Sequence, residues 1–589
     1  MTPPPSDLLH DIFGFHAFRG KQADVIDRIM AGQNTLAVMP TGAGKSLCYQ
    51  YPSVALEGTV VVISPLIALM HDQLRAAEAV GIRAATLTSA DSNREESIAR
   101  FRSGDLDLLY VAPERASGAG FRSLLDQAKI ALFAIDEAHC VSEWGHDFRP
   151  DYRLLRPLLD SFPSVPRLAL TATADTHTRA DILTQLGIKE DGLIIAGFDR
   201  PNIRYHITPR SNGPKQIADL IQSQPGPGIV YAQSRAATEK LAERIALTGR
   251  DARIYHAGLP PEIRAENQAA FVASEDMVMV ATIAFGMGID KPDVRFVAHA
   301  GLPKSVEAYY QETGRAGRDG DPAEAHLFWG ASDFVMARQR LNEIEPSRRD
   351  AERARLNSLA ALVETADCRR AILLRHFGES PPQTCGNCDN CLNPPDSIDA
   401  SVLAQKLLSA VHRTCHSYGI GHVEAVLTGK SDERVRLRGH DALSVFGIVQ
   451  GDEARLIRPL ARTLLAREAL VQTEHGGLAF GPAARPLLRG EEKLALLLPP
   501  LKRKDRRARA VAAMDPADAA LFEALRAKRR DLAAEAGVPP YVIFHDSSLR
   551  EMAALRPGTL SALGEVSGVG VRKLESWGPA FLEVLTAFA

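Results

Sequence analysis

Residues 36–46, LAVMPTGAGKS, decide the fold of the first part of the chain. The apolar start predicts a short strand, the glycines predict a tight turn, and the segment after Ser46 predicts a helix. This order is typical of a loop that binds phosphate, because unpaired N–H groups at the start of the helix face the anion. Gly42 and Gly44 would let the backbone approach the phosphate oxygens.

The same loop carries two side chains suited to a nucleoside triphosphate. Lys45 would reach the β- and γ-phosphates, and the hydroxyl of Ser46 would ligate Mg²⁺. The general form of this motif has glycine at the position of Met39. Taken alone, the loop therefore leaves an ordinary glycine-rich turn between a strand and a helix as the alternative.

An apolar run that ends in two carboxylates supports the nucleotide interpretation. ALFAIDEAH at 131–139 predicts a buried strand followed by Asp136 and Glu137. Asp136 would hold Mg²⁺ through water, and Glu137 would orient and deprotonate an attacking water. The alternative is a solvated acidic strand end, which the apolar run and the upstream phosphate loop disfavour.

A third segment, QETGRAGRDG at 311–320, supplies cations. Arg315 and Arg318 lie three residues apart on a glycine-punctuated stretch. This arrangement suits the stabilisation of charge on a transferring phosphoryl group from across a cleft. In isolation, the segment also fits a basic surface turn.

Short apolar runs alternate with amphipathic segments in two series, which predicts two parallel α/β lobes. The expected strands are 36–39, 60–64, 108–111, 132–135 and 168–170 in the first series, and 228–231, 253–255, 277–281 and 295–299 in the second. The second series begins after Pro201 and Asn202.

Composition bounds the class of protein. The chain has 589 residues, 45% hydrophobic and 24% charged, which excludes a largely disordered chain and predicts several domains. The net charge of −3 does not exclude nucleic-acid binding, because binding depends on where cations cluster. The sequence contains neither a run of about 18 apolar residues nor a secretory signal, so we expect a cytoplasmic protein.

Four of the seven cysteines, Cys368, Cys385, Cys388 and Cys391, crowd one short stretch. Without an export signal, a metal site is a better interpretation than a set of disulfides. Four thiolates suit a tetrahedral site, for which Zn²⁺ is the default ion inside cells. The C-x₂-C-x₂-C run also fits iron–sulfur ligation, which stays open as an alternative.

Eight segments occur in an order that resembles the RecQ family of superfamily 2 DNA helicases. They are PTGAGKS (40–46), SPLIALMHDQ (64–73), YVAPER (110–115), DEAHCVSEWGHDFRPDY (136–152), LALTATA (168–174), IVYAQSR (229–235), ATIAFGMGIDKPDVRFVAH (281–299) and YYQETGRAGRDG (309–320). The phosphate loop of that superfamily reads PTGxGKS, which accounts for Met39. The resemblance covers nearly the whole chain.

The resemblance implies an α/β fold of two tandem RecA-like parallel-sheet lobes, followed by a small zinc-binding helical module, a winged-helix domain and a helical HRDC domain. The expected boundaries are 1–206 and 207–343 for the lobes, 344–400 for the zinc module, 401–490 for the winged helix, 491–515 for a basic linker and 516–589 for the HRDC domain. It also favours zinc over an iron–sulfur cluster.

The resemblance also assigns residues to the nucleotide. FGFHAFRGKQ (13–22) looks like the adenine-recognition segment of the family, in which Phe15 stacks on the base, Arg19 assists and Gln22 reads the base edge. Without the resemblance, the start of an amphipathic helix would be preferred. The expected nucleotide-binding residues are Phe15, Arg19, Gln22, Thr41, Gly42, Gly44, Lys45 and Ser46, with Ser46 and Asp136 at Mg²⁺. The expected catalytic residues are Lys45, Asp136, Glu137, His139, Gln311, Arg315 and Arg318.

Three regions are expected to contact DNA. The resemblance makes Trp144, His146, Phe148 and Arg149 a loop that couples DNA to ATP hydrolysis, since aromatic faces stack on bases and arginine pairs with phosphate. A buried aromatic cluster is the alternative. GHDALSVFG (439–447) is a candidate recognition helix, and His475 lies at the turn of a predicted hairpin, VQTEHGGLAF (471–480), that would act as a wedge or as an ordinary turn.

The C-terminal region resembles the HRDC domain, a helical module that binds single strands. VPPYVIFHD (538–546) matches its signature and makes Tyr541 the base-stacking candidate, with Lys528, Arg529 and Arg530 nearby. VSGVGVRKLESWG (566–578) has the Gly-x-Gly turn of phosphate-binding helical hairpins. A core tyrosine and helix-capping glycines are the alternatives.

Taken together, the resemblance implies an ATP- and Mg²⁺-dependent 3′→5′ DNA helicase. It would act as a monomer on single-stranded, forked and branched DNA in recombination, repair, replication-fork maintenance and the SOS response. Expected partners are single-strand-binding protein and other recombination proteins at the nucleoid. The alternatives are a nucleic-acid-stimulated ATPase that remodels RNA or translocates on duplex without unwinding, and a scaffold with a decayed ATP site, which the intact motifs disfavour.

Overall fold

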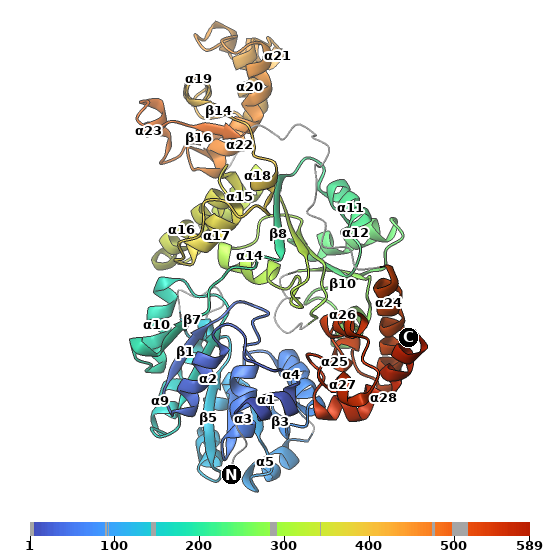
Figure 1. The fold of residues 1–589 in the computed structure, drawn as a ribbon. Helices are drawn as coiled ribbons and strands as arrows, with labels where there is room; N and C mark the ends of the chain where they lie inside the picture. The colour runs from blue at the N-terminus through green and yellow to red at the C-terminus, as the bar shows by residue number, and fades with distance from the viewer. Residues whose placement is uncertain are drawn as a thin grey trace.

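Two parallel β-sheets, each covered by helices on both faces, form the N-terminal lobes of the chain (Figure 1). The computed structural model describes residues 5–88, 91, 93–142, 149–282, 285, 291–341, 343–473, 477–497 and 516–588. The expected fold of two parallel-sheet lobes followed by smaller domains is confirmed.

The first sheet has seven strands in the order β3-β4-β2-β5-β6-β1-β7, all parallel. They are β1 (Thr35–Val38), β2 (Thr59–Ile63), β3 (Ala84–Leu87), β4 (Leu108–Val111), β5 (Ile130–Ile135), β6 (Arg167–Thr171) and β7 (Leu193–Ile195). Because β6 lies between β1 and β5, the loops that follow β1 and β5 meet at one edge of the sheet.

The helices of the first lobe pack on both faces of this sheet. They are α1 (Pro5–Phe13), α2 (Gln22–Met30), α3 (Leu47–Ala55), α4 (Ile67–Ala79), α5 (Arg94–Arg102), α6 (Pro113–Ala116), α7 (Ala119–Leu125), α8 (Pro150–Arg153), α9 (Leu155–Asp160) and α10 (Thr176–Leu186), with the 3₁₀ turns η1 (Ala138–Val141) and η2 (Glu190–Gly192).

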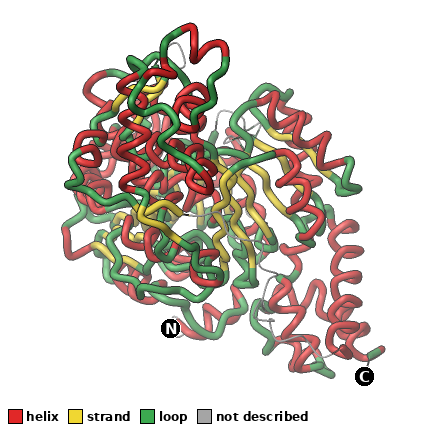
Figure 2. Tube along the Cα trace, turned by 90° about the horizontal axis from the view of Figure 1, so that it is seen from above, coloured by secondary structure: helices red, strands yellow, loops and turns green. Residues whose placement is uncertain are grey.

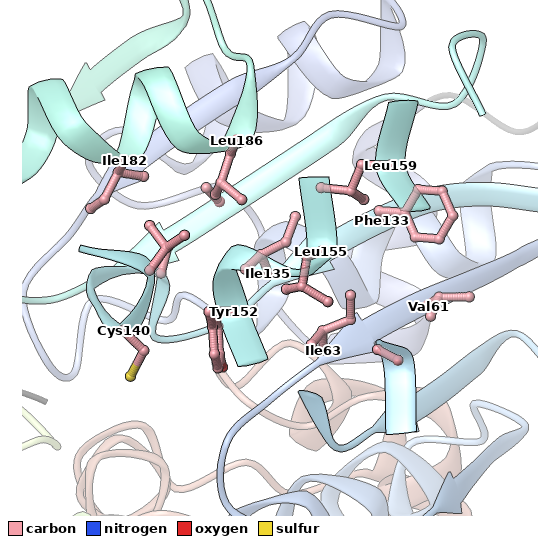
Figure 3. Close-up of a cluster of buried hydrophobic side chains, with 14 of the residues drawn as sticks. Val61, Ile63, Phe133, Ile135, Cys140, Tyr152, Leu155, Leu159, Ile182 and Leu186 are labelled. Atoms are coloured by element: carbon pink, nitrogen blue, oxygen red, sulfur yellow. The ribbon is translucent and has the colours of Figure 1, made fainter. Parts of the chain in front are cut away.

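Alternate residues of each strand enter opposite cores, which explains the continuous apolar runs in the sequence. Val61, Ile63, Phe133 and Ile135 lie in the core beneath α8, α9 and α10 (Figure 3). Their neighbours Val60, Val62, Leu132 and Ala134 enter the core on the other face, with α2 and α3. Burial on both sides fixes the register of the sheet, because a slip of one residue would exchange the two cores.

The second sheet has six parallel strands in the order β10-β11-β9-β12-β13-β8. They are β8 (Ile203–Pro209), β9 (Gly228–Tyr231), β10 (Ala252–Tyr255), β11 (Val278–Ala281), β12 (Phe296–His299) and β13 (Ala323–Trp329). Its helices are α11 (Gly213–Ser223), α12 (Arg235–Ala246), α13 (Pro261–Ala273) and α14 (Val306–Thr313).

Helices and two small sheets follow the second lobe. Next to the lobe are α15 (Ala331–Leu341), α16 (Pro346–Glu364), α17 (Arg369–His376) and α18 (Asp389–Leu392). The next domain contains β14 (Ser397–Asp399), α19 (Ser401–Arg413), α20 (Ile420–Thr428), α21 (Glu433–Leu437), η3 (His440–Ala442), η4 (Gly451–Leu456), α22 (Ile457–Ala466), β15 (Leu470–Gln472), β16 (Leu478–Phe480), α23 (Ala484–Leu488) and β17 (Ala495–Leu497).

The structure tests two expectations in this domain. Strands β15 and β16 pair antiparallel, so the predicted hairpin is confirmed, although His475 lies outside the described residues. The prediction of a recognition helix at 439–447 is wrong. Only the short 3₁₀ turn η3 forms there, because it follows Gly439 with a positive φ angle and ends at Leu443, whose backbone is extended.

Five helices form the C-terminal domain, which packs against the N-terminal lobes rather than against α19–α23 (Figures 1 and 2). They are α24 (Pro516–Ala536), α25 (Pro540–Ile543), α26 (Asp546–Leu555), α27 (Leu560–Gly564) and α28 (Val571–Ala587). Among the residues that the structure describes, no helix has the length and apolar character needed to cross a membrane.

Ion pairs join the C-terminal domain to the second lobe. Glu275 pairs with Arg526, Arg529 and Arg530 at 2.8, 3.2 and 2.6 Å. Arg550 pairs with Asp321. These arginines therefore neutralise acidic groups of the lobe in this arrangement.

Backbone contacts join the same domain to the first lobe. The N–H of Gly568 donates to the carbonyl of Gly14 at 2.8 Å. A Cβ on Gly14 would lie 2.7 Å from the backbone nitrogens of Val569 and Gly570, so a side chain at position 14 would clash with this turn. The predicted Gly-x-Gly turn therefore contacts residues of the first lobe.

We expect Glu275→Arg to release the C-terminal domain from the second lobe. The substitution replaces the shared anion with a fourth cation, and breaking a largely buried ion pair typically costs about 3–5 kcal/mol. Small-angle X-ray scattering should then report a larger radius of gyration. Glu262→Arg, at an exposed site on α13, is the matched control. An unchanged radius in Glu275→Arg would show that these ion pairs do not hold the domain.

Candidate functional site

A cavity of about 320 Å³ is lined by residues of both lobes. Its walls include twelve residues assigned to the nucleotide or to catalysis from the sequence: Phe15, Arg19, Thr41, Gly42, Gly44, Lys45, Ser46, Asp136, Glu137, Gln311, Arg315 and Arg318. Its volume lies within the roughly 300–1,000 Å³ typical of small-molecule sites. The structure therefore gathers segments that are far apart in sequence around one space.

The turn between β1 and α3 forms the floor of this cavity. Gly42 and Gly44 have φ angles of +85° and +72°, which side-chain-bearing residues rarely adopt. Helix α3 begins directly after Ser46, so the positive end of its dipole lies at this turn. The Nζ of Lys45 donates to the carbonyl of Met39 at 3.3 Å. These features suit the binding of an anion at the turn.

Gln22 supports this turn from behind. Its side-chain amide donates to the carbonyls of Ala43 and Gly44 at 2.9 and 3.1 Å, and it accepts from the N–H of Arg19 at 2.8 Å. Gln22 is buried and does not line the cavity. Phe15 and Arg19 do line it, with the guanidinium of Arg19 5.6 Å from the ring centre of Phe15.

Two carboxylates follow β5 at the cavity wall. Burial and the neighbouring Glu137 raise the pKa of Asp136 to about 7, although Lys45 acts in the opposite direction. Glu137 adopts a left-handed conformation, with φ of 48°. Asp136 and Ser46 offer carboxylate and hydroxyl oxygens, the donors that Mg²⁺ prefers. The donor set of the cavity therefore fits a magnesium ion.

His139 lies behind Glu137 rather than in the cavity wall. Its Nδ1 is 3.0 Å from the hydroxyl of Thr171 and 3.3 Å from a carboxylate oxygen of Glu137. Burial lowers the pKa of His139, but Cys140 and Glu137 outweigh burial and raise it to about 10. His139 therefore connects the end of β6 to the carboxylate that follows β5.

The loop after α14 lies directly against the phosphate-loop turn. A Cβ on Gly314 would be 3.3 Å from the Cβ of Thr41, and a Cβ on Gly42 would be 3.4 Å from the Cα of Arg318. Arg315 is buried, while Arg318 and Gln311 are half-buried. The two lobes therefore contact each other at the cavity, with lysine and acids on one side and arginines on the other.

The C-terminal domain also lies at this cavity, which no sequence motif predicted. His545, Ser547, Ser548, Ser567 and Gly568 all contribute to its lining. His545 and Ser567 fall within motifs that the sequence associated with DNA, and no pattern linked them to a nucleotide site. Leu69 and Gln73, from the SPLIALMHDQ segment, also line the cavity, and Gln73 accepts a hydrogen bond from Tyr49 at 2.8 Å.

The structure describes only some of the residues expected to contact DNA. Trp144, His146, Phe148 and His475 lie outside the described residues. Arg149 donates to the carbonyl of Pro65 at 2.9 Å.

Tyr541, the base-stacking candidate, is half-buried. It lines a small cavity between the C-terminal domain and the second lobe, together with Lys291 and Arg529. The C-terminal surface that carries Tyr541 therefore faces the lobe in this arrangement.

The four cysteines meet at one point beside the second lobe. The sulfur atoms of Cys368, Cys385, Cys388 and Cys391 all lie within 4.8 Å of one another. Backbone N–H groups of Ala371 and Asn387 donate to the sulfurs of Cys368 and Cys385, each at 3.4 Å. Four thiols gathered with N–H groups facing them suit thiolates around a tetrahedral Zn²⁺.

Comparison with protein-family models divides the chain among five families. The matches are to the DEAD/DEAH box helicase (19–182), the helicase conserved C-terminal domain (213–320), RecQ zinc-binding (331–392), the RQC domain (394–505) and the HRDC domain (518–585). The zinc-binding match includes all four cysteines, which confirms the expected zinc cofactor.

Three bacterial relatives match nearly the whole chain, and each is named ATP-dependent DNA helicase RecQ. The protein of Pasteurella multocida is 41% identical and the alignment covers 98% of this chain and 93% of the relative. The Haemophilus influenzae protein is 40% identical over 99% and 96%. The Bacillus subtilis protein is 37% identical over 99% and 98%.

We expect Cys388→Ser to remove zinc from the protein. Cys388 is fully buried among the other sulfurs, and the hydroxyl of serine is a poor zinc ligand at this position. Elemental analysis should find about one zinc per chain in the wild type and much less in the variant. Cys415→Ser, at an exposed cysteine outside the cluster, should keep the metal. A brown protein that contains iron would instead support the iron–sulfur alternative.

Proposed function

The chain belongs to the RecQ family of ATP-dependent DNA helicases, and on this premise we propose how its residues hydrolyse ATP and move DNA. One observation carries the proposal: the cavity places Lys45, Asp136 and Glu137 of the first lobe opposite Arg315 and Arg318 of the second. Groups that act on a triphosphate only when the lobes meet can couple hydrolysis to lobe movement.

In this proposal the phosphate-loop turn binds the α- and β-phosphates, and Lys45 contacts the β- and γ-phosphates. Ser46 and Asp136 hold Mg²⁺, which neutralises charge on the phosphates when bound. Glu137 accepts a proton from the water that attacks the γ-phosphorus, while the bond to the bridging oxygen of ADP breaks. Arg315 and Arg318 stabilise negative charge that develops on the transferring group.

His139 and Gln311 complete the proposed catalytic set in supporting roles. His139 keeps Glu137 in place through the contact described above. Gln311, on α14, lines the cavity from the second lobe. Phe15 and Arg19 are positioned at the same cavity to contact the base, while Gln22 holds the phosphate-loop turn.

We further propose that binding and release of ATP closes and opens the lobes, which moves the protein along one DNA strand in the 3′→5′ direction. Family membership supports this polarity and a role in recombination, repair, replication-fork maintenance and the SOS response. It also supports action as a monomer in the cytoplasm, at the nucleoid, with single-strand-binding protein and other recombination proteins as partners.

We expect ATP turnover to require Lys45 and Glu137 and to rise when single-stranded DNA is added. Lys45→Ala removes the cation at the β- and γ-phosphates and should abolish hydrolysis while leaving DNA binding intact. Glu137→Gln keeps the shape of the side chain but removes the base, so it should bind ATP without turning it over. Phosphate release with and without single-stranded DNA measures both effects. Continued turnover in Lys45→Ala would make the phosphate-loop assignment wrong.

We expect the wild type to displace a strand from forked DNA but not from forked RNA. Displacement of RNA, or ATP turnover without displacement of either, would instead favour an RNA remodeller or a duplex translocase.

Affinity for single-stranded DNA should fall steeply as salt rises, because phosphate contacts release counterions. Fluorescence anisotropy over a range of salt concentrations measures this slope. A flat response would contradict binding through phosphate contacts.

A further inference from the structure

The segment that connects the two lobes passes through the contact between them. It comprises residues 196–202, between the end of β7 and the start of β8. Arg200, in this segment, is buried, with 9% of its surface exposed. No sequence motif predicted a role for this residue.

The guanidinium of Arg200 bonds to both lobes at once. One terminal nitrogen, Nη1, donates to the carbonyl of Thr41 at 2.7 Å and to that of Gly314 at 3.0 Å. The other, Nη2, donates to the carbonyls of Ala316 and Gly317 at 2.8 and 2.9 Å. Thr41 belongs to the phosphate-loop turn, and the other three acceptors belong to the loop that carries Arg315 and leads into Arg318.

These acceptors are carbonyls, and this makes the arrangement sensitive to backbone position. A buried cation is costly unless its donors are satisfied. Here the guanidinium donates to four backbone oxygens, so the cation is stable only while both loops keep their places. Burial accordingly lowers the pKa of Arg200, although the group stays protonated.

The rest of the connecting segment is held firmly, so that Arg200 acts from a fixed point. The ring of Phe198 stacks on Phe377 at 4.5 Å between centres, and its carbonyl accepts from the hydroxyl of Tyr310 at 2.7 Å. The carbonyl of Pro201 accepts from Asn387 at 3.1 Å. Asn387 follows Cys385 in the cysteine cluster, so the metal module also anchors the segment.

We propose that Arg200 is a positioning residue for ATP hydrolysis: its guanidinium sets the loop carrying Arg315 and Arg318 against the phosphate-loop turn. The inference rests on the proposed function, since it assigns those two arginines to the transferring phosphoryl group. Arg200 itself does not line the cavity, so it acts through the positions of other residues.

Arginine is required here rather than any cation. The guanidinium presents a planar fork of donors that can face two loops at fixed angles, whereas the lysine ammonium is a compact point charge. Lysine at this position would keep the charge and reach one side of the contact but not both. Arg200→Lys therefore tests geometry with the charge retained.

The test compares Arg200→Lys and Arg200→Ala with the wild type in DNA-stimulated ATP hydrolysis. We expect kcat to fall by about 10²-fold in Arg200→Ala, the loss associated with displacing catalytic groups by about 1 Å. Arg200→Lys should lose less, and KM for ATP should change by less than about threefold in both. Equal loss in kcat and affinity would overturn the proposal, since it would indicate general damage to the site.

A double-mutant cycle with Arg315→Ala separates positioning from structural support. If Arg200 acts through the arginine loop, the loss of turnover caused by Arg200→Lys should be smaller in the Arg315→Ala background than in the wild type. If the fold-loss in ATP hydrolysis of the double variant equalled the product of the two single fold-losses, the proposal would be overturned. Comparison with Arg200→Lys, which retains the buried charge, keeps the test valid if Arg200→Ala unfolds.

Arg210→Lys provides a matched control. Arg210 is also a partly buried arginine, and it donates to the carbonyl of Ala300 and to Asp333. Both partners follow Arg210 in the sequence, so neither belongs to the first lobe. Its substitution should leave kcat unchanged. Absence of ATP turnover in the wild type would refute the proposed function. Normal turnover in Arg200→Lys and Arg200→Ala, with slower turnover in Arg315→Ala, would refute only the role of Arg200.

Discussion

Direct contact between the phosphate-loop turn and the loop at 314–318 is the constraint on which the site depends. A Cβ on Gly314 would crowd Thr41 at 3.3 Å, and a Cβ on Gly42 would touch Arg318 at 3.4 Å, so the two loops lie in direct contact. The lysine, the acids and the arginines share one cavity only because the two backbones come this close. In the first lobe the phosphate-loop turn follows the carboxyl end of β1, whereas in the second lobe the loop at 314–318 joins α14 to the amino end of β13.

The sequence predicted the strands of the two lobes except β3, β7, β8 and β13. Strands buried on both faces, such as β2 and β5, are continuous apolar runs that stand out from their surroundings. Strands β8 and β13 alternate buried and half-buried residues, among them His206 and Glu324, and so lack a continuous run. Strand β7 has only three residues, too few for any periodicity.

Most residues of the nucleotide site could also be predicted from local motifs, because loops that bind phosphate and magnesium need particular residue types in particular orders. The roles of Arg200, His545 and Ser567 could not be predicted, because these residues belong to no such local motif. Their partners are backbone carbonyls or residues more than one hundred positions away, and a carbonyl leaves no mark in a sequence. Only the assembled fold brings such groups together.

The C-terminal helices form part of the cavity wall, and this has a consequence for the end of each catalytic cycle. ADP and inorganic phosphate held in this cavity would lie beside His545, Ser547 and Gly568. Movement of the C-terminal domain would therefore change the surroundings of the products, a kind of step that often limits turnover. A domain that is expected to bind DNA would thereby also influence the release of products from the ATP site.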